Sequence, residues 1–133
     1  MVTQYTGGAH CCVATWFTAR KDDAWQLTQG PMLDGGGYWL EDVDRDRSYE
    51  LLSVDNAFLY AFESYAGSFS TIRVQRLRNG ALEPVPRNGD WKRRIVQDLG
   101  GKGYVARLDP ALWTCNAFRG PWVATRLMTA ASK

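Results

Sequence analysis

The sequence predicts an α+β fold, in which an antiparallel β meander is followed by C-terminal helices that pack on it. Three observations predict this class. Residues 9–86 contain short segments, rich in aromatic and β-branched residues, that alternate between apolar and polar positions. Asn79-Gly80 is a strong signal for a two-residue hairpin turn. After residue 90 the apolar residues recur at helical spacing.

Length and composition limit the class of protein. With 133 residues, the chain suits one domain with a hydrophobic core, so we expect a single domain over 1–133, β-rich over 9–86 and helical over 90–131. Hydrophobic residues at 45% and charged residues at 23% are typical of a globular protein. A formal charge of +2 gives no reason to expect a nucleic-acid partner. No apolar run approaches the length of a membrane span.

The first strands are expected near the N-terminus. Ala9–Arg20 is rich in β-forming residues, and Lys21-Asp22-Asp23 provides a polar turn. Trp25–Thr28 alternates as a returning strand should. The segment 30–37 contains four Gly and one Pro, which predicts a loop.

Four further segments predict the meander. In Thr71–Arg78, one face carries Ile72, Val74, Arg76 and Arg78, because side chains alternate along a strand. Four antiparallel strands have the size of one propeller blade, although 133 residues are too few to close a propeller. The predicted strands are Tyr49–Val54, Ala57–Tyr65, Thr71–Arg78 and Ala81–Val85.

The last third predicts two helices. Residues 90–99 carry apolar residues at helical spacing, with Asp90 as N-cap and Gly100-Gly101 as the end. A second helix is expected to open at Asp109-Pro110. We expect Gly120-Pro121 to break it, with a further turn or two over 122–129.

The segment that carries most chemistry is an acidic loop between Leu40 and Glu50. Asp42, Asp44, Asp46 and Glu50 stand at offsets one, three, five and nine, and Ser48 at offset seven can add its backbone carbonyl. Calcium takes about six to eight oxygen ligands, which alternate residues of a tight loop can direct inward. The spacing therefore predicts a calcium site.

An EF-hand is excluded. That motif needs Gly at its sixth position and a bidentate acid at its twelfth, where this chain has Arg47 and Ser53. The flanking segments also predict strands rather than helices.

The pattern Asp42-x-Asp44-x-Asp46 with Glu50, followed by apolar Leu51-Leu52, resembles the FG-GAP-type calcium loops of integrin-like propellers and related bacterial secreted proteins. The likeness is local, to about residues 38–85. It implies a bound ion that braces a loop between strands and performs no chemistry. Arg45 and Arg47 replace the usual glycines, so an alternative is a loop whose Asp-Arg-Asp-Arg run replaces calcium with internal ion pairs.

The three cysteines allow several interpretations. Neighbours in a strand face opposite ways, so only one of Cys11 and Cys12 could readily form a disulfide with Cys115. His10 next to them allows a thiol-dependent enzyme, a redox protein or a zinc site, although the geometry is awkward for each. Buried thiols that pack as small apolar groups are the structural alternative.

The aromatic residues exceed the needs of a small core. Those predicted near loops could be exposed and bind a protein or a sugar, because rigid rings add contact area at little entropic cost. This candidate binding set is Tyr38, Trp39, Tyr65, Phe69 and Trp91.

Together these features favour a non-enzymatic binding module, periplasmic or secreted, that acts on a protein or envelope component and holds a structural calcium-type loop. The N-terminal residues lack the features of a signal peptide, so a cytoplasmic location is the alternative. Two other functions remain open: a thiol-dependent enzyme or redox protein, and a structural fragment of a larger repeat protein. The sequence does not indicate an oligomeric state.

Overall fold

The computed structural model describes residues 1–9 and 11–130. Their contacts group into two compact units. The first consists of Met1–Val54 and Arg73–Val85, and the second of Asp55–Ile72 and Pro86–Lys133. Each unit is described by itself below.

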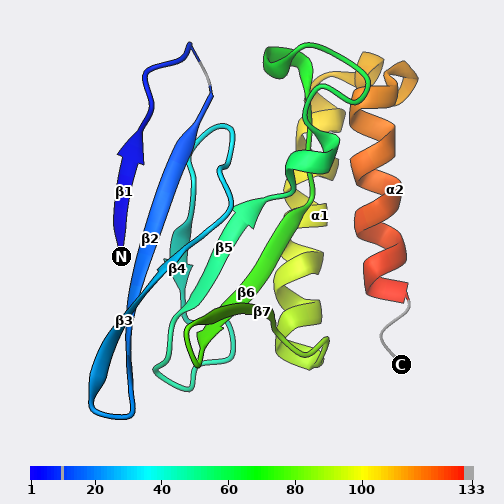
Figure 1. The fold of residues 1–133 in the computed structure, drawn as a ribbon. Helices are drawn as coiled ribbons and strands as arrows, with labels where there is room; N and C mark the ends of the chain where they lie inside the picture. The colour runs from blue at the N-terminus through cyan, green and yellow to red at the C-terminus, as the bar shows by residue number, and fades with distance from the viewer. Residues whose placement is uncertain (10, 131–133) are drawn as a thin grey trace. The chain divides into compact units, whose positions relative to one another are not determined.

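Strands dominate the first unit and form two antiparallel sheets (Figure 1). The three-stranded sheet has the order β1-β2-β3, with β1 Val2–Tyr5, β2 Val13–Lys21 and β3 Ala24–Gln29. The four-stranded sheet has the order β4-β5-β6-β7, with β4 Trp39–Glu41, β5 Glu50–Val54, β6 Ile72–Arg78 and β7 Ala81–Pro84.

Turn chemistry explains the two tight hairpins. Arg78 pairs with Ala81, and Asn79-Gly80 between them adopts positive φ angles of 50° and 77°. Asn and Gly tolerate this left-handed conformation, so the predicted β6–β7 hairpin is confirmed. At the β2–β3 turn, Asp22 and Asp23 also have positive φ, 46° and 61°.

A cluster of apolar side chains joins the two sheets. Phe17, Leu33, Tyr38 and Leu51 are buried together, and Leu77 and Leu82 pack against them. The rings of Phe17 and Tyr38 meet edge to face with centroids 5.2 Å apart, an arrangement that aromatic pairs prefer.

The predicted α+β class is confirmed, because two antiparallel sheets are followed by helices in the C-terminal third. The β4-β5-β6-β7 sheet is also a meander. Its membership differs from the prediction, since β4 supplies a strand that we did not expect. β1 was likewise not predicted.

Ala57–Tyr65, predicted as a strand, is not one. This segment begins with the short 3-10 helix Asn56–Phe58 and ends at a second, Tyr65–Gly67. The Asp55 carboxylate accepts a hydrogen bond from the Ala57 N–H at 3.1 Å, so local capping competes with strand pairing. The Phe62 ring instead lies against Gly120, leaving no room for a side chain there.

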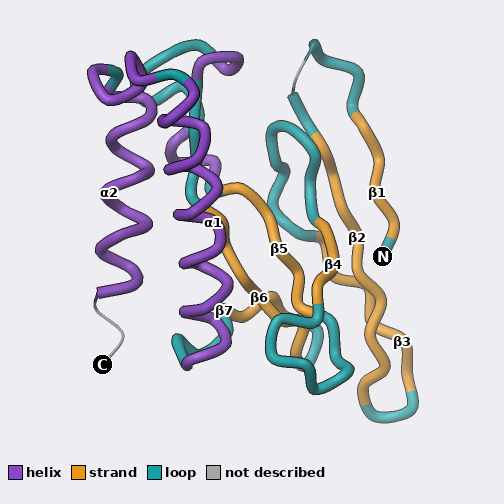
Figure 2. The backbone as a smooth tube through the Cα atoms, turned by 180° about the vertical axis from the view of Figure 1, so that it is seen from behind, coloured by secondary structure: helices purple, strands orange, loops and turns teal. Residues whose placement is uncertain are grey.

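Two helices form most of the second unit: α1 Gly89–Leu108 and α2 Asn116–Ala130, with the 3-10 helix Pro110–Thr114 between them. They run antiparallel, side by side (Figures 1 and 2). Asn88 caps α1 by accepting from the Trp91 N–H at 3.0 Å, so the N-cap is Asn88 rather than the predicted Asp90. Asp109 caps the 3-10 helix.

The expected helix breakers do not break the helices. α1 continues through Gly100-Gly101, and α2 continues through Pro121. Helical Gly costs about 1 kcal/mol and helical Pro about 3 kcal/mol. Burial of Ala106 beyond the glycines, and of Phe118 and Pro121 in α2, offsets these costs.

Among the described residues, no helix combines the length and apolar character needed to cross a membrane.

Candidate metal site

The acidic loop connects β4 to β5 in the first unit. Glu41 at the end of β4 pairs with Glu50 at the start of β5. The chain between these partners must therefore turn back on itself, and it does so with the loop's own carboxylates as hydrogen-bond acceptors.

Three backbone N–H groups donate to the aspartates of the loop. Ser48 N donates to Asp46 Oδ1 at 2.7 Å, Asp46 N to Asp44 Oδ1 at 3.3 Å, and Arg47 N to Asp42 Oδ2 at 3.1 Å. The bond from Ser48 is the main reason that the pKa of Asp46 lies below its ordinary value. The bonds that Asp44 and Asp46 accept each span two residues and form consecutive Asx turns, whereas the bond that Asp42 accepts spans five residues.

Arg45 and Arg47 both adopt the left-handed conformation, with φ of 61° and 71°. These are the positions at which the resembled loops carry glycine. A non-glycine residue in this conformation costs about 1–3 kcal/mol. The loop therefore keeps this backbone path without glycine.

Glu50 is the most buried member of the loop, with 1% of its surface exposed. Its Oε2 accepts from the Val43 N–H at 2.8 Å, and its Oε1 accepts from Arg76 Nε at 2.6 Å. A buried carboxylate needs such partners, because its transfer from water is otherwise strongly unfavourable.

Arg76 of β6 is the cation that pairs with the loop. Its Nη2 lies 2.5 Å from Asp44 Oδ2 and 3.5 Å from Asp46 Oδ2. The hydrogen bond to Glu50 is the largest cause of the raised pKa of the Arg76 guanidinium. The arginines within the loop, Arg45 and Arg47, are exposed.

Arg76 was not among the predicted site residues, although the sequence holds a signal for it. It shares a strand face with the buried residues Ile72 and Val74. A charged residue on an apolar face requires an opposite charge nearby. That requirement could have directed attention from β6 to the acidic loop.

The structure brings together three of the four predicted carboxylates. One carboxylate oxygen from each of Asp42, Asp44 and Glu50 lies within 4.8 Å of the others. Asp42 Oδ1 is buried and has no hydrogen-bond partner among the described residues. The Asp46 carboxylate does not belong to this group. Asp46 and Ser48 line a hollow with Tyr49, Arg76, Leu77 and Arg78.

The cysteines differ from the expected pairing. Cys11 and Cys12 are joined to each other, and Cys115 is a free cysteine. Strand alternation does not separate the two neighbours, because both precede the first residue of β2, Val13. The predicted contribution of His10 lies outside the described residues.

The candidate binding aromatics are not one exposed set. Tyr38 and Trp91 are buried, so their predicted exposure is wrong. Trp39 is 37% exposed, and Tyr65 and Phe69 are half-buried. Trp39 belongs to the first unit, whereas Tyr65 and Phe69 belong to the second.

The two most exposed aromatics among the described residues were missed. Trp25 on β3 is 74% exposed, and Tyr49 beside the hollow is 65% exposed. Trp25 and Leu27 share a face of β3 by strand alternation, and Leu27 is also exposed.

The burial of Tyr38 predicts that its phenol ionises at a higher pH than the exposed tyrosines. Burial raises its pKa above 10.0, so the folded state holds the phenol proton more tightly than the unfolded state. The protonated Tyr38 phenol therefore contributes stability that is fully present below its unfolded-state pKa of 10.0. This contribution is lost as the pH rises through the higher pKa of the folded state. Absorbance titration of tyrosinate should detect one tyrosine that ionises later than the exposed ones.

Tyr38→Phe is the control for that titration. It should remove the late transition without lowering the free energy of unfolding, because the Tyr38 hydroxyl is buried without a hydrogen-bond partner among the described residues. A late transition that persists in Tyr38→Phe would contradict the assignment.

Comparison with known proteins finds relatives but no family model that matches and no solved structure that matches. The chain is 37% identical over 124 residues to the uncharacterised protein y4bJ of Sinorhizobium fredii. The aligned region covers 93% of this chain and 20% of that protein. It is 39% identical over 83 residues to the probable thylakoid lumen protein sll0997 of Synechocystis. Here the aligned region covers 61% of this chain and 24% of that protein. The chain thus spans about a fifth to a quarter of the length of these relatives.

Proposed function

We propose that this chain is a non-enzymatic binding module of the FG-GAP-like type, located outside the cytoplasm and braced by a calcium-type loop. The observation that carries the proposal is the convergence of the Asp42, Asp44 and Glu50 oxygens, with the buried Asp42 Oδ1 left without a hydrogen-bond partner among the described residues. An unpaired buried carboxylate oxygen is costly, and a cation would remove that cost.

Two features of the loop support calcium as the ion. The ligands are all oxygens, which suit calcium or magnesium rather than zinc. Arg45 and Arg47 adopt the left-handed backbone conformation in this loop, although that conformation is unfavourable for residues other than glycine. Ser48 would add a backbone carbonyl after a small adjustment of the loop.

Arg76 bears on the affinity of the site. Its guanidinium already pairs with Asp44 and Glu50, so calcium must compete with a cation that belongs to the protein. We therefore propose weak binding, with a dissociation constant of about 0.1–1 mM, as in extracellular modules. Such a site fills where calcium is abundant, which is outside the cytoplasm.

The non-cytoplasmic location is supported by one relative, because sll0997 is a probable thylakoid lumen protein. The binding role is supported by exposed aromatic residues of the first unit, Trp25, Trp39 and Tyr49. Exposed rings are typical of surfaces that bind proteins or sugars. A protein or an envelope component is the partner class that we propose.

Calcium titration followed by thermal unfolding tests the proposal. Addition of about 10 mM calcium to chelator-treated protein should raise the melting temperature, because an ion that binds only the folded state stabilises it by mass action. At about ten times the dissociation constant the gain is about 1.4 kcal/mol.

Asp42→Asn is the matched control. It can keep the hydrogen bond from the Arg47 N–H while removing the charge, so it should fold but lose the calcium response. Magnesium at the same concentration controls for ionic strength. A wild-type melting temperature that calcium leaves unchanged would remove the metal from the proposal.

A further inference from the structure

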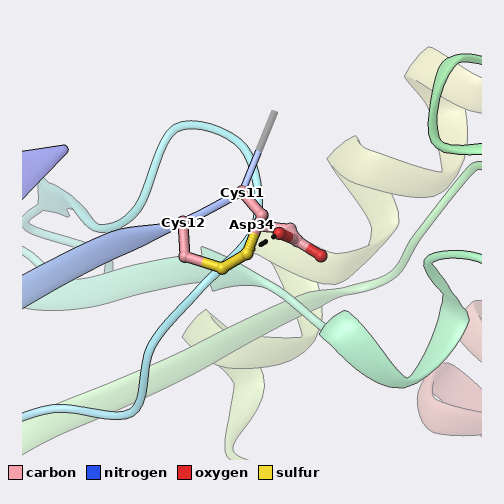
Figure 3. A group of neighbouring side chains, drawn as sticks. All are labelled: Cys11, Cys12 and Asp34. Atoms are coloured by element: carbon pink, nitrogen blue, oxygen red, sulfur yellow. Dashed lines mark hydrogen bonds between the residues drawn. A yellow bond between two sulfur atoms is a disulfide. The ribbon is translucent and has the colours of Figure 1, made fainter. Parts of the chain in front are cut away.

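A second cluster of reactive side chains lies in the first unit, away from the acidic loop in the sequence. Cys11 and Cys12 directly precede β2 and are joined through their sulfur atoms, with Asp34 beside them (Figure 3). Cys11 is exposed, and Cys12 and Asp34 are half-buried. The two sulfurs and one Asp34 oxygen all lie within 4.8 Å of one another.

Thr6 holds the backbone of Cys12 through three hydrogen bonds. Thr6 N and Thr6 Oγ1 both donate to the Cys12 carbonyl at 2.9 Å, and Cys12 N donates to Thr6 Oγ1 at 2.9 Å. Cys12 thus has its backbone donor and acceptor satisfied by one residue of the N-terminal segment.

The next residue brings Asp34 to the pair. Val13 N donates to the Leu33 carbonyl at 2.6 Å, and Leu33 N donates to the Val13 carbonyl at 3.0 Å. Because this two-bond bridge aligns the segments around residues 12 and 34, Cys12 Sγ lies 3.5 Å from Asp34 Oδ1. When the pair is reduced, the Cys12 thiol can donate a hydrogen bond across this distance.

A disulfide at this place is not explained by stability. A cross-link stabilises mainly by closing a long loop in the unfolded chain, and these two residues are adjacent. Exposed disulfides have higher reduction potentials than structural ones and are the more labile. Adjacency and the exposure of Cys11 both indicate a bond that can open and close.

We infer that Cys11 and Cys12 form a reversible thiol–disulfide exchange site whose oxidant is a small-molecule disulfide, with Asp34 as the residue that slows its closure. One cysteine thiolate attacks the oxidant, forms a mixed disulfide and releases one thiol. The neighbouring cysteine then attacks its partner's sulfur in that mixed disulfide, closes the Cys11–Cys12 bond and releases the second thiol. The pair loses two electrons and two protons, and the oxidant gains both as two thiols.

The role of Asp34 follows from charge. The attacking species is a thiolate, and the carboxylate of Asp34 repels a negative charge on Cys12. Its hydrogen bond with the protonated thiol further favours the unreactive form. Asp34 is therefore a positioning residue that keeps the reduced pair from closing quickly.

Thiol counting tests the exchange. Cys115→Ser protein is fully reduced, freed of reductant, incubated with oxidised glutathione and then alkylated with N-ethylmaleimide. Intact mass should show two adducts before oxidation, and none afterwards, with a mass lower by two hydrogens and no bound glutathione. Two adducts after oxidation, a persistent glutathione adduct, or a disulfide-linked dimer would each overturn the inference.

Two variants keep the test informative. In a Cys115→Ser background, Cys12→Ser should stop at the glutathione adduct on Cys11, because no resolving thiol remains. Asp34→Asn should close severalfold faster at pH 7 than the parent. Asp22→Asn, an exposed acid in the β2–β3 turn, is the matched control and should close at the parent rate. Equal rates for Asp34→Asn and the parent would overturn the role of Asp34.

Discussion

Replacing Glu50 with alanine is expected to lower the free energy of unfolding by about 3–5 kcal/mol, the usual effect of breaking a buried ion pair. The substitution removes a carboxylate that is 1% exposed, and it leaves the Val43 N–H and Arg76 Nε without their acceptor. Chemical unfolding followed by circular dichroism measures the change. The variant should also lose any response to calcium.

Glu83→Ala is the control for this substitution. Glu83 is exposed on β7 of the same sheet, so its removal should change stability by no more than about 0.5 kcal/mol. If Glu50→Ala cost as little as Glu83→Ala, the loop would not depend on Glu50, and the brace would have to lie elsewhere.

Replacing Arg76 with glutamine is expected to have two opposite effects. Without calcium, the variant should be less stable by about 3 kcal/mol, because Glu50 and Asp44 lose the cation that compensates their charge. With calcium, the ion no longer competes with the guanidinium. Its affinity should therefore rise at least tenfold, about 1.4 kcal/mol, as measured by calorimetric titration.

Arg73→Gln separates this effect from a general loss of positive charge. Arg73 is exposed on β6, on the opposite face from Arg76, so its removal should leave both stability and calcium affinity near the wild-type values. Equal affinity in Arg76→Gln and wild type would show that Arg76 does not compete with calcium. Absence of binding in both would refute the calcium proposal, while a loss of stability in Arg76→Gln would still identify Arg76 as the loop's cation.

The exchange site at Cys11 and Cys12 is independent of these tests. It depends on Thr6, Leu33 and Asp34 rather than on the acidic loop. A protein that fails to bind calcium could still exchange disulfides, and a protein that fails to exchange disulfides could still bind calcium.

Local chemistry made several features predictable from the sequence. The alternation of Thr71–Arg78 and the pair Asn79-Gly80 act within a few residues, and both describe β6 and its hairpin correctly. The spacing of the four acids predicted carboxylates that converge, and those of Asp42, Asp44 and Glu50 do so whereas that of Asp46 does not. In each case the interacting groups lie close together in the chain.

Tertiary structure decided what depends on distant partners. The cation of the loop comes from Arg76, 26 residues beyond Glu50, and the two meet only when the chain folds. The position of Arg76 on an apolar strand face predicts an opposite charge nearby but does not say which one. α1 and α2 continue through Gly100-Gly101 and Pro121 because burial outweighs weak local propensity.

By itself, then, the sequence determined the strands with clear alternation, the hairpin turn and the acidic spacing, because these depend on backbone preferences of neighbouring residues. Only the tertiary structure decided that the Phe62 ring lies against Gly120, that α1 and α2 continue through Gly100-Gly101 and Pro121, and that Arg76 faces Glu50. These outcomes depend on packing and charge compensation, whose energies are set by contacts that the folded chain alone creates.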